Sequence, residues 1–115
     1  MNLLIAASNA PVVSEFDVSV SPSSYFNQVN KGAFTTPTFR ANAVNNVGEI
    51  SYLWSVENYT GNGTAEILSP TSDSTRVTVS SVGPEINFIL KCTATDDNGS
   101  DSSNAFVSIF FGDIL

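Results

Sequence analysis

The chain has 115 residues, of which 42% are hydrophobic and 13% are charged, and this size and composition predict one compact domain. Its 11 acidic and 4 basic residues give a net charge of -7, which repels a phosphate backbone, so nucleic acid is not an expected partner. The apolar run at residues 3–7 is far shorter than the roughly 20 residues of a membrane helix, so we expect a soluble protein without membrane insertion.

Cysteine usage and the N-terminus bear on where the protein is made. Cys92 is the only cysteine, so an internal disulfide is impossible, and a lone cysteine favours a chain that folds in a reducing cytoplasm. Residues 1–15 contain an apolar run but lack the positive region and the length of a secretory signal peptide. We therefore interpret residues 1–15 as an N-terminal arm and residues 16–115 as one domain.

The first half of the domain alternates apolar and polar residues, a period that predicts strands with one buried face. Turn-forming residues at 21–24 and 27–32 keep the first of these strands short. In the third strand, Tyr52, Trp54 and Val56 share a face. The predicted strands of this half are residues 16–20, 38–44 and 50–56.

The second half begins with a segment rich in turn formers, residues 58–64, which predicts a loop. Two short strands are predicted after it, at residues 65–68 and 76–80. Gly83 and Pro84 are expected to end the second of them, because proline removes a ladder donor and glycine frees the backbone.

The most regular alternation lies at residues 85–95 and predicts the strongest strand. Its inward-facing residues are Ile86, Phe88, Leu90, Cys92 and Ala94. The dipeptide Asn98-Gly99 then predicts a hairpin to an antiparallel strand at residues 105–111. With no helical period anywhere, about seven short strands predict an all-β chain folded as a two-sheet antiparallel β-sandwich, with a closed barrel as the alternative.

Three segments carry a resemblance to a known family. They are Tyr-Leu-Trp-Ser-Val at residues 52–56, Leu-Ser-Pro-Thr-Ser at residues 68–72, and Phe-Ile-Leu-Lys-Cys-Thr-Ala-Thr-Asp-Asp-Asn-Gly-Ser at residues 88–100. Together they resemble the immunoglobulin-like domains of tailed-bacteriophage virion proteins. The same order of features is similar to PKD-type modules, in which a tryptophan strand precedes a strand ending in Thr-Asp-x-x-Gly. The resemblance covers residues 16–111.

This resemblance implies an immunoglobulin-like sandwich of about seven strands, in which Trp54 packs between the sheets. Cys92 takes the place of a cysteine that bridges the sheets in antibody domains. The sequence departs from the antibody pattern at two places. Neither Phe39 nor Ala41 supplies a partner cysteine, and Leu90 stands where the tyrosine corner requires tyrosine.

Residue types that carry catalysis are scarce. The chain has no histidine, and Cys92 alternates inward with no base beside it, so we predict a core cysteine, no catalytic residue, no cofactor and no enzyme. Residues 96–101, Asp-Asp-Asn-Gly-Ser-Asp, crowd oxygen ligands together but lack the spacing of an EF-hand loop. We expect a solvated hairpin turn there, and hence no metal site.

The aromatic residues outnumber what one small core must hold. Those that are candidates for exposure are Tyr25, Phe26, Phe34, Tyr59, Phe106 and Phe110. Two apolar sets alternate along residues 106–111, so one set faces the core. The other set is expected to meet a partner or to be covered by the N-terminal arm.

The resemblance implies a structural or accessory virion protein of a tailed bacteriophage, a capsid decoration or tail accessory protein that binds the particle exterior. Its expected location is the virion, after synthesis in the bacterial host cytoplasm, and its expected partners are capsid or tail proteins and sister copies. We expect arm residues 2–13 to dock on a neighbour, for example by adding a strand to a sheet edge. The alternative is an adhesion module for host-surface glycans, with Tyr59 as the stacking face.

Overall fold

The computed structural model describes residues 15–30 and 32–112. Over these residues the chain forms strands and no helix, and therefore no helix long and apolar enough to cross a membrane. The strands are β1 (Asp17–Ser21), β2 (Ser24–Val29), β3 (Gly32–Thr35), β4 (Phe39–Val44), β5 (Ser51–Ile67), β6 (Ser74–Thr75), β7 (Val77–Thr95) and β8 (Ser100–Phe111).

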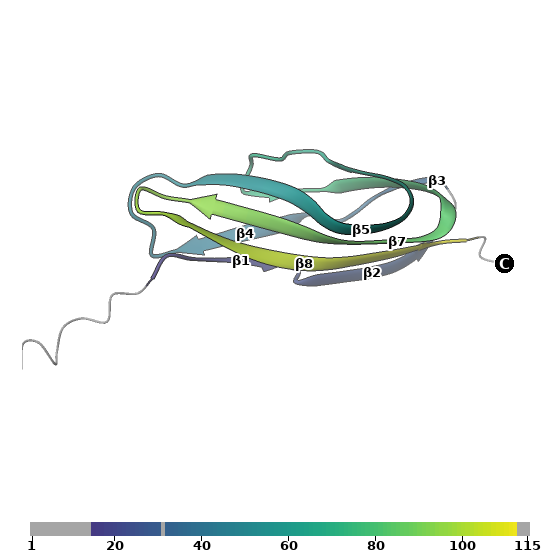
Figure 1. Ribbon diagram of the computed structural model, residues 1–115, viewed down its shortest axis with the longest axis horizontal. Helices are drawn as coiled ribbons and strands as arrows, with labels where there is room; N and C mark the ends of the chain where they lie inside the picture. The colour runs from purple at the N-terminus through teal and green to yellow at the C-terminus, as the bar shows by residue number, and fades with distance from the viewer. Residues whose placement is uncertain (1–14, 31, 113–115) are drawn as a thin grey trace, which may run out of the picture.

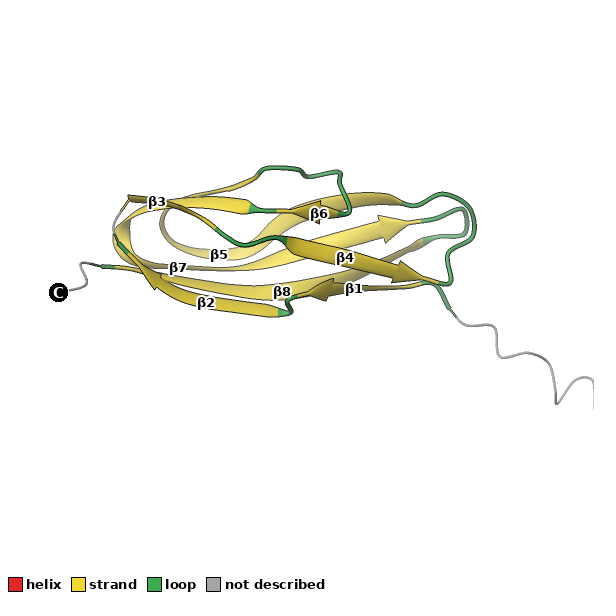
Figure 2. Cartoon of the chain, turned by 180° about the vertical axis from the view of Figure 1, so that it is seen from behind, coloured by secondary structure: helices red, strands yellow, loops and turns green. Residues whose placement is uncertain are grey.

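The strands form two sheets, which confirms the predicted all-β sandwich. One sheet has the order β1-β4-β6, and the other has the order β2-β8-β7-β3 with β5 also paired to β7. Figure 1 shows β5, β7 and β8 side by side in the larger sheet, and Figure 2 shows β1, β4 and β6 on the other side. Every pairing is antiparallel except one, because β2 runs parallel to β8.

The core lies between the two sheets and follows the period of two. In β7 the predicted inward residues are all 3% exposed or less, and they are Ile86, Phe88, Leu90, Cys92 and Ala94. Phe39 of β4 is fully buried in the same cluster and comes from the opposite sheet. The partial burial of Ala41 and Ala43 on the same side as Phe39 agrees with the predicted phase of this strand.

Two predicted breaks lie inside long strands. Residues 58–64 belong to β5 rather than to a loop, and Gly83 and Pro84 belong to β7 rather than ending a strand. The turn-forming residues are accommodated by irregular pairing, since the β5–β7 register shifts on both sides of Gly61. Gly61 has a φ of 118°, and a Cβ placed there would lie 2.4 Å from the carbonyl oxygen of Glu85, so only glycine lets the two backbones approach so closely.

The prediction of turns at residues 21–24 and 27–32 is wrong in part. Pro22 lies between β1 and β2, where the chain leaves one sheet for the other, and proline has no N–H for either ladder. Beyond it, however, β2 continues through Asn27 to Val29 and pairs with β8, and β3 follows at Gly32–Thr35. The polar side chains of β2 fit a strand because this strand lies at the edge of its sheet.

Candidate functional site

The outer face of the larger sheet carries exposed aromatic side chains. Phe26 of β2 is 67% exposed and Phe106 of β8 is 60% exposed, which is unusual for phenylalanine in a folded domain. Phe110 of β8 is half-buried, and its ring lies 5.2 Å from that of Phe26 in an edge-to-face arrangement. With Ile89 of β7, these three residues form what we call the aromatic face.

The strand register places these side chains together. On β8, Phe106 pairs with Ile89 of β7 on one side and with Ser24 of β2 on the other. Phe26 follows Ser24 by two residues, so its side chain points to the same side of the sheet. The hairpin strands β7 and β8 and the distant strand β2 therefore contribute to one apolar surface.

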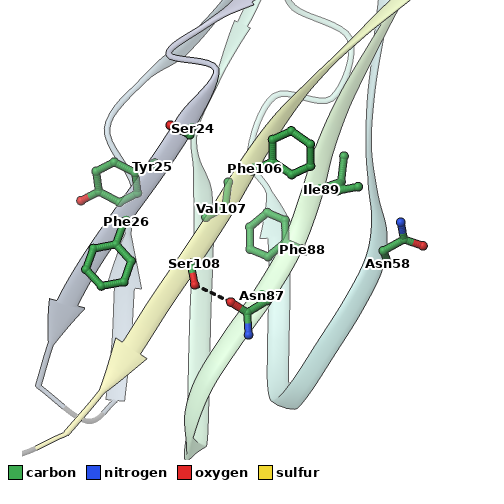
Figure 3. A pocket seen from close by; sticks show the side chains of 10 residues that line it. All are labelled: Ser24, Tyr25, Phe26, Asn58, Asn87, Phe88, Ile89, Phe106, Val107 and Ser108. Carbon is green, nitrogen blue, oxygen red and sulfur yellow. Dashed lines mark hydrogen bonds between the residues drawn. The ribbon is translucent and has the colours of Figure 1, made fainter.

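A hollow of about 320 Å³ lies in this surface, and Figure 3 shows its lining residues. Its walls include Phe26, Phe106 and Ile89, and none of the described residues that line it is charged. The Ser108 hydroxyl donates a hydrogen bond to Oδ1 of Asn87, which is drawn as a dashed line in Figure 3. The hollow therefore offers mainly apolar contacts, in a protein whose net charge is -7.

The charged groups nearest to Ile89 on this face lie beside the hollow rather than within it. Lys91 of β7 and Glu57 of β5 form an ion pair with an N–O distance of 3.7 Å, and both are partly exposed. An exposed pair of this kind contributes little to stability, because water and salt screen it. Glu85 accepts a hydrogen bond of 3.1 Å from the Asn87 amide, which orients that amide at the hollow.

The open edge of β2 lies next to the aromatic face. The amide N of Phe106 donates to the carbonyl of Ser23, and that of Gly112 donates to the carbonyl of Val29, so odd-numbered backbone groups of this segment face β8. Even-numbered ones, including those of Phe26, point to the open edge because strand neighbours alternate. On that edge the side chain of Asn27 already accepts the N–H of Gln28 at 2.8 Å.

Cys92 lies where the sequence predicts it, fully buried in the core. Burial raises the pKa of its thiol to about 11, since desolvation disfavours the thiolate. A thiol in this environment is a poor nucleophile.

The turn at residues 96–101 is built around the carboxylate of Asp96. This carboxylate accepts backbone N–H groups from Val47 at 2.8 Å, Asn98 at 2.9 Å and Gly99 at 3.0 Å. The hydrogen bond from Val47, followed by those from the turn, lowers the pKa of Asp96 below its ordinary value. In the described part of the chain no three acidic or cysteine side chains gather as a cation site, and the absence of a calcium requirement stays a prediction.

Tyr59 does not present the free ring that a glycan-stacking role requires. It lies in β5, and its ring stacks against Phe88 with a centroid distance of 6.4 Å while packing on the core. Its hydroxyl is buried without a hydrogen-bond partner among the described residues, and desolvation raises the pKa of this hydroxyl. A glycan-binding role for Tyr59 in an open loop is therefore not compatible with this geometry.

The other aromatic candidates divide into two groups. Tyr25 and Phe34 pack against the core, and their rings stack at a centroid distance of 6.4 Å. Phe26 and Phe106 are exposed, so they are the ones that form a surface. The predicted N-terminal arm, including residues 2–13, lies outside the described residues except for Glu15.

Sequence reasoning did not find the aromatic face as a unit. It left open which set of residues 106–111 faces outward, and the structure shows Phe106 outward with Val107 and Ile109 buried. It also missed the pairing of β2 with β8, which brings Phe26 beside Phe110. The sequence of β2, Ser-Tyr-Phe-Asn-Gln-Val, carries no clear period of two, since Tyr25 and Phe26 are adjacent aromatic residues and the polar Asn27 lies on the inward side.

Comparison with known proteins bears on the fold. Neither a protein-family model nor a curated protein sequence matches the chain. Among solved structures, the PKD domain of human KIAA0319 matches with a TM-score of 0.56 and 13% identity, over 90% of this chain and 88% of that chain. The fold is immunoglobulin-like. The titin M3 domain, at a TM-score of 0.46 and 16% identity, covers 76% of this chain and 88% of its own.

This immunoglobulin-like domain is all-β and two-layered, as the sequence predicts. At 13% identity the similarity to the PKD domain shows the fold alone, and it carries neither an activity nor a partner to this chain. The two antibody features that the sequence lacks are accounted for in the packing. Phe39, at a position where a bridging cysteine could stand, fills the core, and Leu90 is fully buried in place of a tyrosine.

Proposed function

We propose that this protein is a non-catalytic structural component of a multi-copy protein assembly, attached through its aromatic face. The observation that carries the proposal is the exposure of Phe26 and Phe106 beside one uncharged hollow. Exposed apolar patches on small domains usually mark sites that bind another protein, since leaving them in water costs free energy. A buried cysteine with a raised pKa and a chain without histidine support a binding role over catalysis.

The assembly that we propose is the exterior of a tailed-bacteriophage particle. The support for this is the resemblance of the tryptophan strand and of the Cys92-to-Gly99 hairpin to immunoglobulin-like virion domains. The negative charge fits a component displayed at high density on a particle, because it limits nonspecific association. Many copies on a repeating lattice would each need only a weak contact, since multivalency multiplies it.

Adhesion to host glycans is the second candidate, relocated from Tyr59 to the aromatic face. The hollow combines exposed phenylalanine rings with the amide of Asn58 at its margin. Apolar rings beside hydrogen-bonding amides are the groups that a sugar ring needs. The apolar character of the hollow favours a protein contact over this alternative.

The test is to purify intact particles from the source lysate and measure the copy number of this protein against the major shell protein. Added back to particles that lack it, the parent protein should sediment with them, whereas the double variant Phe26→Thr/Phe106→Thr should not. Threonine keeps the preference for a strand while removing the ring. Leu53→Thr is the matched control, since Leu53 is exposed on β5 and does not line the hollow.

Three results would argue against parts of this proposal. Absence of the protein from purified particles would contradict its proposed location on the virion. Equal sedimentation of the double variant and the parent would remove the aromatic face as the contact. Binding of the parent protein to a glycan array, lost in the double variant, would favour adhesion.

A further inference from the structure

We propose that the aromatic face is occupied by the N-terminal segment of a second copy, whose residues 3–7 add a strand to the open edge of β2. This inference rests on the proposed function, in that the aromatic face must be a protein contact, and it names the partner.

Among the described residues, no strand pairs with the edge of β2 that faces away from β8. An incoming strand would have to replace the bond that the Gln28 N–H on this edge makes with the Asn27 side chain. The ladder with β8 uses the backbone groups of residues 23, 25, 27 and 29, as the bonds from Phe106 to Ser23 and from Gly112 to Val29 require. The N–H and C=O of Phe26 consequently face away from the sheet. An extended segment that pairs here gains main-chain hydrogen bonds, and its alternate side chains lie on the outer face beside the Phe26 ring.

Residues 1–14 match this surface in chemistry. Their sequence, Met-Asn-Leu-Leu-Ile-Ala-Ala-Ser-Asn-Ala-Pro-Val-Val-Ser, has no charged side chain, so the whole net side-chain charge of -7 lies in residues 15–115. An uncharged segment approaches an acidic copy without side-chain repulsion, and it lies against the Phe26 side of a hollow whose described lining has no charged side chain. Because residues 3–7 are all apolar, either alternation places apolar side chains on the outer face beside the Phe26 ring, at the margin of the hollow.

The position of Glu15 favours a second copy over the same chain. Glu15 lies at the end of the sandwich beside the turn at residues 96–101, since Asn45 donates to its carbonyl and the pocket at that turn includes it. From there β1 runs toward β2, and 11 residues separate Glu15 from Phe26, about 35 Å of extended chain. Residues 3–7 are only 8–12 residues from Glu15, so they would have to double back at once and stay fully extended.

The doubling-back path is also obstructed. A segment returning along β1 needs the outward backbone groups of that strand, and the N–H of Val18 is already bonded to Oδ2 of Asp101 at 2.9 Å. The segment of a second copy does not follow this path. A reciprocal exchange between two copies would cover both aromatic faces at once. The two copies would be related by a two-fold axis, which is the commonest symmetry of homodimers.

The experiment uses the full chain and two variants that break opposite halves of the contact. Phe26→Thr/Phe106→Thr removes the rings of the hollow, and Leu4→Asp/Ile5→Asp places a charge on each alternation of the segment. In sedimentation velocity the parent should be a dimer, and each variant alone should dimerise at least about tenfold more weakly. An equimolar mixture of the two variants should recover a dimer, because one intact segment meets one intact hollow.

Matched controls separate this contact from general effects of charge and folding. Ser8→Asp/Asn9→Asp adds the same two charges outside residues 3–7 and should dimerise like the parent, as should Leu53→Thr. Circular dichroism melting checks that each variant is folded. If the two broken variants fail to complement each other, or if the parent is a monomer at all accessible concentrations, a second copy does not fill the hollow.

The outcomes also separate this inference from the proposed function. A monomeric parent that still binds particles, and loses that binding with Phe26→Thr/Phe106→Thr, would overturn the exchange while leaving the aromatic face as the lattice contact. A dimer that tolerates Phe26→Thr/Phe106→Thr would overturn the exchange as well, because the contact would then lie elsewhere.

Discussion

Trp54 of β5 and Cys92 of β7 are register partners across an antiparallel ladder, and both side chains are buried. The indole Nε1 donates to the carbonyl of Ser72 at 2.7 Å, so the ring is fixed by a polar contact at one end and by apolar packing along its length. The family resemblance implies that Trp54 packs between the sheets, and its 2% exposure confirms that it is buried.

Trp54→Ala is expected to destabilise the domain by about 3–5 kcal/mol, the range for truncating a large aromatic residue in a core. Part of that loss comes from the Ser72 carbonyl, which loses its donor. Urea unfolding followed by circular dichroism measures the loss in the free energy of unfolding. Trp54→Phe keeps a ring without the N–H and should lose less. A native emission spectrum typical of an indole in water would contradict the packing described above.

Cys92 should resist thiol reagents in the native protein. Its thiol is fully buried, so a reagent cannot reach it in the folded protein. Its pKa is raised to about 11, so at neutral pH almost none of it is the reactive thiolate. Because the folded pKa exceeds the ordinary value of 9.0, the unfolded chain ionises first, and this contribution to stability is lost as pH rises from about 9 to about 11. Ellman's reagent should react only after denaturant is added, and rapid labelling of folded protein would show that the core opens.

The central strands were predictable because their phase is visible locally. In residues 85–95 every even-numbered residue is apolar and every odd-numbered one except Ile89 is polar, so only one register buries the full apolar set. The long continuation of β5 through residues 58–64 was not predictable in this way. Gly61 and Asn58 read as turn residues, and their positive φ angles serve bulges that depend on the opposing backbone of β7.

The candidate site was less predictable than the core. Phe26 and Phe106 are 80 residues apart in the sequence, and their proximity depends on the parallel pairing of β2 with β8. No local pattern specifies such a partner, because parallel strands are not joined by a short turn. The alternation of residues 106–111 did restrict Phe106 to one of two faces, and only the position of the core decided between them.

Asp96→Asn tests the electrostatic part of the hairpin. Asparagine has the same size as aspartate, but it has only one acceptor oxygen. If that oxygen accepts the N–H of Asn98, the NH2 group faces the N–H of Val47 and both are donors. The variant should therefore be less stable than the parent. Since hydrogen bonds lower the folded pKa of Asp96, its contribution is present above the unfolded pKa of about 4 and is lost as pH falls through the folded value.

Urea midpoints measured from neutral pH down to acid pH check this dependence. The gap between parent and Asp96→Asn should be widest near neutrality and should narrow below about pH 4. Asp97→Asn, at an exposed neighbour in the same turn, should show a smaller gap throughout. A gap that does not change with pH would mean that the Asp96 charge is not what stabilises the turn.

Gly61→Ala should destabilise the domain more than Gly32→Ala does. Both glycines have a φ near +120°, so both alanines carry backbone strain of about 1–3 kcal/mol. At Gly61 the new Cβ would also lie 2.4 Å from the carbonyl oxygen of Glu85, whereas at Gly32 no described atom lies within 4 Å of it. Thermal melting of both variants measures the two losses of stability, and their difference gives the part due to the Glu85 contact rather than to backbone strain. Equal losses would indicate that the β5 bulge moves freely away from β7.

Deleting residues 2–13 should leave a folded domain. Each described strand lies between Asp17 and Phe111, and the buried core is assembled from these strands alone. Glu15 would remain, and with it the carbonyl that accepts the Asn45 amide at 3.1 Å at the start of β1. The truncated protein should therefore keep its strand signal in circular dichroism and its cooperative melt, while its binding to particles that lack the protein, and to sister copies, weakens.

Unfolding on truncation would make residues 2–13 part of the core, and undiminished binding in a sedimentation assay would remove them from the interface. The two measurements are independent, because the first depends on packing between the sheets and the second on what covers the rings of Phe26 and Phe106.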